Sequence, residues 1–283
     1  MKKSDVKVCI VRAPGTNCDA ETLDGVRAAG AGAGSEIIHF NRLHGGSRKL
    51  EDYDALIFPG GFSYGDQVRS GVIWARKFHG LLGDELKAFV EAEKPVLGIC
   101  NGMQVIVESG LLPGLRGVSE SPEACMASNA SARYECRWIR LKKTGDSLFT
   151  RGYANGSNGY ADGEVVEMPV GHAEGKFTLE PGKEKRILEE LEAGKQIVFR
   201  YCKQDGSLAR GEYPVSPNAS LDDVAGVCNP AGNVFALMPH PDRSCFGWQR
   251  RDWTRTGGAA KADSEGDGLR IFKGLVDYCA KKF

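Results

Sequence analysis

The chain has 283 residues, and its 37 Lys and Arg side chains balance 37 Asp and Glu side chains, so the formal net charge is zero. This length is enough to bury a full hydrophobic core. A balanced charge without a basic stripe argues against a nucleic-acid partner or an anionic membrane partner. No apolar run approaches the ~18 residues of a membrane span, and Lys7 interrupts the first apolar run, so no secretory signal is predicted. We therefore expect a soluble, cytoplasmic protein.

Short apolar runs alternate with helical patterns through the first hundred residues. Strands are predicted over residues 6–11, 36–40, 53–58 and 96–99, and helices over 18–30, 66–78 and 84–93. This alternation predicts an α/β fold with a doubly wound, mostly parallel sheet of the flavodoxin-like kind. Ligands of such sheets bind beyond the carboxyl ends of the strands.

The pattern changes after residue 119. Further strands are predicted over residues 134–141, 163–170, 197–201, 224–228 and 234–238, with a hairpin turn at 231–233 and a closing amphipathic helix at 269–279. We expect this half to extend the sheet with a small antiparallel part. Residues 6–280 are predicted to form a single domain, with a mobile surface loop over 254–268.

The most informative segment is Gly98-Ile99-Cys100-Asn101-Gly102, which ends an apolar strand and opens a helical pattern. This is the strand–turn–helix setting of a nucleophile elbow, with sulfur in place of oxygen. Glycines on both sides remove side chains that would crowd so sharp a turn. A helix N-terminus also favours a thiolate at Cys100. The alternative is a buried structural cysteine, because free cysteines are often buried.

A cysteine nucleophile needs a base, and His240 is the best placed of the five histidines because a strong strand pattern leads into it. Asp242 follows at i+2, where an extended segment would put both side chains on one side. A plain His-Pro-Asp turn is the structural alternative. His172 has Glu174 at i+2 as well, but it lies in a Gly-flanked segment that we predict to be a binding loop.

When a cysteine nucleophile attacks a carbonyl group, the carbonyl oxygen becomes an oxyanion that needs hydrogen-bond donors. The Gly60-Gly61 segment offers exposed N–H groups at a strand end, and the N–H of Asn101, just after the nucleophile, is the usual second donor. No phosphate-binding loop is found: the Gly171–Lys176 stretch has the wrong spacing. The nine cysteines include no C-x-x-C pair, so neither a zinc ribbon nor any other metal site is predicted.

Together these motifs resemble the triad glutamine amidotransferases, the class I glutaminase domains. The loop at 58–66, the elbow at 98–104 and the segment 238–242 occur in the order typical of that family. Three further segments, at 12–19, 129–137 and 169–177, are similar to the glutaminases of phosphoribosylformylglycinamidine synthases. One residue departs from the family pattern, which has Glu where this chain has Asp242.

The resemblance implies a function for each segment. Cys100 would be the nucleophile, His240 the base and acid with Asp242 as third member, and Gly61 and Asn101 the oxyanion donors. The glutamine pocket would be lined by Gln104, Asn129, Ser131, Arg133, Tyr134, His172 and Glu174.

The resemblance also implies partners. Ammonia would pass to a synthetase subunit that holds ATP and magnesium and makes phosphoribosylformylglycinamidine for purine biosynthesis, and a small third subunit would bridge the two. This chain itself would hold no cofactor. Two alternatives stay open: a cysteine peptidase or deglycase on the same scaffold, and a regulatory module without catalysis.

Overall fold

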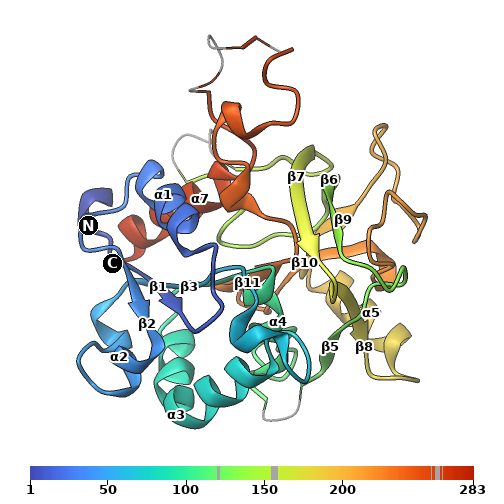
Figure 1. Cartoon of the computed structure of the whole chain (residues 1–283). Helices are drawn as coiled ribbons and strands as arrows, with labels where there is room; N and C mark the ends of the chain where they lie inside the picture. Colours follow the sequence, from blue (N-terminus) through green and yellow to red (C-terminus); the bar gives the residue numbers. More distant parts are fainter. Residues whose placement is uncertain (120–121, 154–158, 256, 259–261, 263) are drawn as a thin grey trace.

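The structure is a computed structural model, and it describes residues 1–119, 122–153, 159–255, 257–258, 262 and 264–283. Within these residues a nine-stranded sheet runs through the centre of the molecule in the order β2-β1-β3-β4-β11-β10-β9-β6-β7 (Figure 1). Its strands are β1 (Val8–Arg12), β2 (Glu36–His39), β3 (Ala55–Phe58), β4 (Val96–Ile99), β6 (Glu135–Lys143), β7 (Val165–His172), β9 (Ile197–Tyr201), β10 (Val224–Cys228) and β11 (Val234–Leu237).

The first five strands of that order are parallel to one another. Strands β3, β4 and β11 are buried along their whole length, as expected for strands covered by helices on both faces. Helices α1 (Asp19–Ala28) and α7 (Leu269–Lys282) lie together on one face, and α3 (Val72–Glu91) and α4 (Asn101–Glu108) lie on the other (Figure 1). The predicted doubly wound α/β fold class is confirmed.

The remaining four strands, β10, β9, β6 and β7, are antiparallel to their neighbours. The predicted turn between β10 and β11 is present, with Gly232 at φ +73°. A separate antiparallel pair joins β5 (Ala124–Ala127) to β8 (Lys176–Leu179), beside helix α5 (Glu184–Ala193). The antiparallel extension therefore has four strands in the main sheet as well as this pair.

Some elements differ from the sequence prediction. The helices predicted at 66–78 and 84–93 are one element, α3, interrupted by non-helical backbone at Leu82. The strand predicted at 36–40 ends at His39, and a short helix, α2 (Phe40–His44), begins directly after it. The predicted loop at 254–268 includes 256, 259–261 and 263, which lie outside the described residues. No helix of the described residues is long and apolar enough to cross a membrane.

The sheet order brings three chain segments to one edge. Strand β4 lies between β3 and β11, and the register pairs Phe58 with Gly98 and Leu237 with Ile99. Because these strands are parallel, their carboxyl ends meet at the same edge, where ligands of such sheets bind. The Gly60-Gly61 turn, Cys100 and His240 follow these ends and are therefore neighbours.

Candidate active site

The backbone at Cys100 is strained in the manner of a nucleophile elbow. Its φ is +51° and its ψ is −105°, a conformation that non-glycine residues adopt rarely and at a cost of about 1–3 kcal/mol. Glycines make the turn possible: a Cβ on Gly102 would lie 1.9 Å from the carbonyl oxygen of Phe58, and one on Gly98 would lie 2.7 Å from the carbonyl oxygen of Gly102. The predicted strand–turn–helix setting is thus present.

This turn places the thiol at the start of helix α4, in a site that is 5% exposed. The N–H of Cys100 donates to the carbonyl of Leu237 at 2.8 Å, which ties the elbow to the end of β11. The thiol donates to the carbonyl of Gly171 at 3.5 Å. A thiolate here would be stabilised by the free N–H groups of the helix N-terminus.

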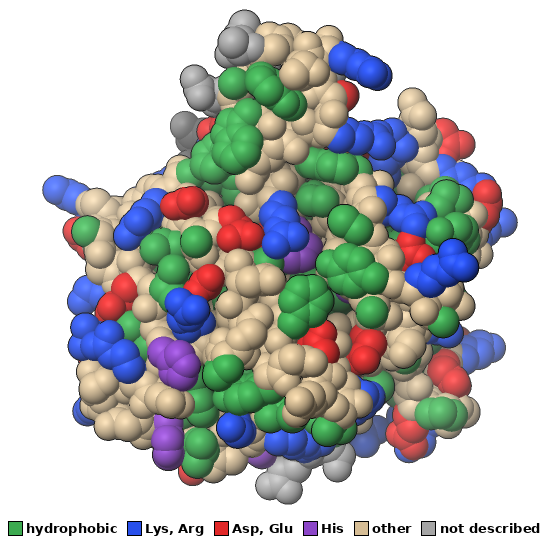
Figure 2. Space-filling model, viewed as in Figure 1, with side chains coloured by type: hydrophobic (Ala, Val, Ile, Leu, Met, Phe, Trp, Pro, Cys, Tyr) green, Lys and Arg blue, Asp and Glu red, His purple; other side chains and the backbone are tan. Residues whose placement is uncertain are grey.

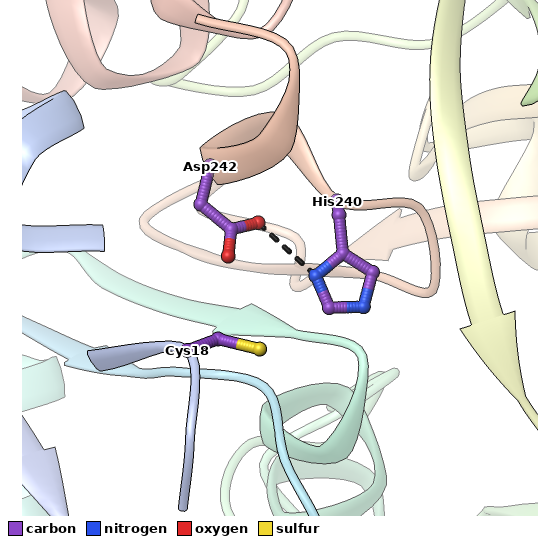
Figure 3. Close-up of side chains that lie close together, drawn as sticks. All are labelled: Cys18, His240 and Asp242. Atoms are coloured by element: carbon purple, nitrogen blue, oxygen red, sulfur yellow. Dashed lines mark hydrogen bonds and ion pairs between the residues drawn. The ribbon is translucent and has the colours of Figure 1, made fainter. Parts of the chain in front are cut away.

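His240 pairs with Asp242 in a buried position. Nδ1 of the imidazole lies 3.2 Å from Oδ1 of the carboxylate (Figure 3). A carboxylate can only accept, so Nδ1 donates, and Nε2 is the nitrogen left to exchange a proton with Cys100. Burial alone would lower the pKa of His240, but the negative charges of the Asp242 carboxylate and of a Cys100 thiolate raise it well above its usual value.

The route by which Asp242 reaches His240 differs from the prediction. The sequence pattern suggested an extended segment, but Pro241–Arg243 forms a 3-10 turn instead. Proline at the first position of this turn has the fixed φ that such a start requires. The turn brings the shorter carboxylate of Asp242 back to the imidazole.

The two predicted oxyanion donors have free N–H groups. Among the described residues, neither the N–H of Gly61 nor that of Asn101 donates to an acceptor. Gly61 has a φ of +144°, and a Cβ there would lie 2.8 Å from the carbonyl oxygen of Gly15. This position therefore requires glycine, and its close packing fixes the direction of the N–H.

Gln104 is part of a buried network rather than a free pocket residue. Its Oε1 accepts from the side chain of Asn101 at 2.8 Å, and its Nε2 donates to the backbone carbonyl of Glu174 at 2.6 Å. The carboxylate of Glu174 accepts from the N–H of Ser70 at 3.0 Å. These bonds link α4 to the segments at 63–70 and 172–175 around the nucleophile.

His172 ends strand β7 and does not lie in a loop, contrary to the prediction from its glycine neighbours. The side-chain amide of Asn129 donates to two carbonyls and accepts, through Oδ1, from the N–H of Gly175 at 3.0 Å and from Nδ1 of His172 at 3.0 Å. Nδ1 must therefore carry the proton. Burial lowers the pKa of His172 to about 3, so it is neutral and is not the base.

The other predicted pocket residues lie nearer the surface. Ser131 and Arg133 line a cavity of about 390 Å³ whose walls do not include Cys100 or His240. Tyr134 is half-exposed, and its hydroxyl lies close over Gly171, next to the nucleophile. Its ring lies 6.3 Å from that of Phe62. Hydrophobic, acidic and basic side chains are interspersed on the face drawn in Figure 2.

No function is predicted for Cys18 from the sequence, yet its thiol lies beside His240 and Asp242 (Figure 3). Cys18 caps the start of α1, and a Cβ on Gly60 would lie 3.0 Å from its sulfur and 2.8 Å from Cε1 of His240. The segment 12–19 stood out only through the family resemblance, and no local pattern reveals that it packs against residues more than 200 positions away.

Comparison with known proteins identifies the family to which the chain belongs. Residues 5–279 match the family model of the CobB/CobQ-like glutamine amidotransferase domain. The chain is 39% identical to the phosphoribosylformylglycinamidine synthase subunit PurQ of Archaeoglobus fulgidus over 99% of this chain and 100% of that protein. It is 34% identical to PurQ of Pyrococcus furiosus over 96% and 98%.

Among solved structures, PurLQS from Thermotoga maritima is similar, with a TM-score of 0.68 and 28% identity over 97% of this chain and 99% of the other. The glutaminase domain of Trypanosoma brucei CTPS has a TM-score of 0.51 at 12% identity, which shows the shared fold alone. The chain therefore belongs to the CobB/CobQ-like glutamine amidotransferase family and, within it, to the PurQ subunits of phosphoribosylformylglycinamidine synthase.

Proposed function

We propose that this chain hydrolyses glutamine to glutamate and ammonia through a thioester on Cys100, and that the ammonia serves phosphoribosylformylglycinamidine synthesis. The observation that carries the proposal is a strained cysteine at a helix N-terminus, one strand away from a buried His240–Asp242 pair. Such a combination supplies a nucleophile, a base and the group that orients the base.

The first half of the reaction forms the thioester. The proton of the Cys100 thiol moves to Nε2 of His240, and the sulfur attacks the side-chain amide carbon of glutamine. The N–H groups of Gly61 and Asn101 stabilise the oxyanion that develops. When the C–N bond breaks, His240 returns the proton to the departing nitrogen, and ammonia leaves.

The second half releases glutamate. Water attacks the thioester carbon while Nε2 of His240 accepts one of its protons, and the same oxyanion donors act again. The C–S bond breaks, glutamate leaves, and the sulfur recovers the proton from His240. Asp242 holds the imidazole in place through Nδ1 and stabilises its charged form in both halves.

The partner of this chain follows from its relatives. The Thermotoga maritima structure is one of a complex named PurLQS. We propose that this chain likewise assembles with a synthetase subunit and a small bridging subunit, and that ATP and magnesium are held by the synthetase. We also propose that residues 6–280 act as one domain, for which the continuous sheet from β2 to β7 is the support. The cytoplasmic location stays a prediction.

Replacing the nucleophile tests the proposal. In the assembled complex, Cys100→Ala should abolish glutamate release and glutamine-dependent amination while leaving amination from added ammonia unchanged. Cys136→Ala, which removes an exposed thiol, should leave both reactions intact and is the matched control. Glutamate release by the Cys100→Ala variant at the wild-type rate would refute the assignment of the nucleophile.

A further inference from the structure

A second buried thiol lies next to the catalytic pair, on the side of the imidazole that faces Asp242. The sulfur of Cys18, one imidazole nitrogen of His240 and one carboxylate oxygen of Asp242 all lie within 4.8 Å of one another, and the sulfur points toward the other two side chains (Figure 3). We propose that these three side chains form an inhibitory site for Zn²⁺, distinct from the thiol that attacks glutamine.

The donor set and its spacing suit zinc. Thiolate sulfur, imidazole nitrogen and carboxylate oxygen are the ligands that zinc takes in proteins, at about 2.0–2.3 Å. Tetrahedral bonds of that length separate neighbouring donors by roughly 3.3–3.7 Å. Nδ1 of His240 and Oδ1 of Asp242 are already 3.2 Å apart. If the Cys18 sulfur moves toward the other two donors by about 1 Å, the three side chains can bind one zinc ion together, and a water molecule supplies the fourth ligand.

Two further observations point to a cation at this place. Oδ2 of Asp242 is buried and has no hydrogen-bond partner among the described residues, although a buried carboxylate oxygen needs one. The guanidinium of Arg243 already lies 3.0 Å from the Cys18 sulfur, so a positive charge is held there now. The Arg243 side chain is 43% exposed and can turn outward when a metal ion replaces it.

Zinc at this site would stop the reaction proposed above, and this part of the inference rests on that function. The Cys18 thiol loses its proton to solvent as the sulfur binds. A neutral imidazole bound to metal through Nδ1 carries its one proton on Nε2. Nε2 then has no lone pair for the proton of Cys100, so the nucleophile is not activated. Because the metal lies behind the ring, inhibition should not be relieved by glutamine.

Cobalt spectroscopy tests the site independently of activity, because Co²⁺ substitutes for Zn²⁺ and shows a thiolate charge-transfer band. The wild-type chain should bind one Co²⁺ with this band, and zinc should displace it. Cys18→Ser should lose the band and weaken zinc inhibition by at least about tenfold, as expected for removal of a ligand. Its metal-free glutaminase activity should stay of the same order. Cys18→Ala provides a second variant with the same expectation.

Two controls separate this site from its nearest competitor, a metal held by the nucleophile. Cys100→Ser and wild-type chain labelled at Cys100 with a glutamine-analogue electrophile should both keep the cobalt band. Cys136→Ser should behave as wild type. Loss of the band in Cys100→Ser with retention in Cys18→Ser would overturn the proposal, and so would a wild-type chain without the band. A wild-type chain that shows the band but no glutaminase activity in the assembled complex would refute the proposed function but not the metal site.

Discussion

Replacement of Asp242 by Asn tests how the third triad member works, because it keeps the size of the side chain and removes its charge. In the structure the carboxylate does two things for His240: it accepts the Nδ1 proton at 3.2 Å, and it raises the pKa of the imidazole well above its usual value against the opposing effect of burial. The amide of an asparagine can accept the hydrogen bond from Nδ1 in only one of its two orientations.

Both orientations of the amide are unfavourable. With its oxygen toward Nδ1, the NH₂ group occupies the place of Oδ2, which has no partner among the described residues, and a buried unpaired donor costs about 1–3 kcal/mol. With its NH₂ toward Nδ1, the imidazole must carry its proton on Nε2 and cannot accept from Cys100. Loss of a charge-assisted hydrogen bond of about 1.5–3 kcal/mol predicts a roughly 10- to 150-fold fall in kcat/KM.

The assay is glutamate release as a function of pH. Cys100 and His240 share one proton in the reactive pair, and the raised pKa of His240 holds that proton on the imidazole. Without the carboxylate this pKa falls and the shared proton is lost at lower pH, so the alkaline limb of the kcat/KM profile should move to lower pH. A loss of folding alone would reduce the amplitude without moving the limb. Asp223→Asn is the matched control, because Asp223 is a buried carboxylate that accepts from two backbone N–H groups outside the triad. It should lower the thermal midpoint and leave the pH profile unchanged. An Asp242→Asn enzyme with wild-type kcat/KM and profile would refute the reasoning.

Three further predictions concern stability and the pocket. The folded pKa of His172, lowered to about 3 by burial, lies below its unfolded value of 6.5, so the free energy of unfolding should fall by about 1.4 kcal/mol per unit as pH drops from 6.5 toward 3. Chemical denaturation at a series of pH values should show that the free energy of unfolding of His172→Gln depends less steeply on pH than that of the wild type. An unchanged pH dependence would contradict the neutral state of the buried His172. Gln104→Glu sets a carboxylate against the carbonyl of Glu174, so we expect a raised KM for glutamine; an unaltered KM would mean that this network does not shape the pocket. Gly102→Ala, with its Cβ 1.9 Å from a carbonyl oxygen, should be far less stable than Gly80→Ala, which meets nothing within 4 Å on helix α3; equal thermal midpoints would count against a tight elbow.

The sharp turn at Cys100 could be predicted from sequence because its signal is local. Gly98 and Gly102 flank Cys100 within five residues, and the close contacts that exclude a Cβ at both positions come from the elbow and from the adjacent strand β3. The position of His240 beside Cys100 could be predicted for a similar reason: an apolar strand leads straight into it, and parallel strands carry their following residues to the same edge of the sheet.

Elements stabilised by distant contacts were harder to predict. Strands β5 and β8 are four residues each and pair only with one another across about 50 residues of chain, and Ala124–Ala127 has no β-branched residue. Helix α5 is a different case. Its buried Ile187 and Leu191 are spaced i, i+4 among charged residues, and this pattern is sufficient to predict a helix from the sequence.

His172 shows how neighbouring glycines can mislead. Gly171 and Gly175 suggested a loop, but Gly171 is buried in β7, where the hydroxyl of Tyr134 occupies the space that a Cβ would need. Gly175 is required because a Cβ there would lie 2.3 Å from Nδ1 of His172. Both glycines therefore reflect close packing around a strand end, which single-sequence patterns do not distinguish from a turn.

The aspartate in place of the family's glutamate shows how backbone and side chain compensate. A side chain shorter by one methylene can pair with His240 only if its backbone comes closer, and the 3-10 turn at Pro241–Arg243 provides that approach. Oδ2 of the same carboxylate is buried without a partner among the described residues. The turn that brings Asp242 to His240 therefore also holds this pair within reach of the Cys18 sulfur, so the proposed triad and the proposed zinc site share the same two side chains.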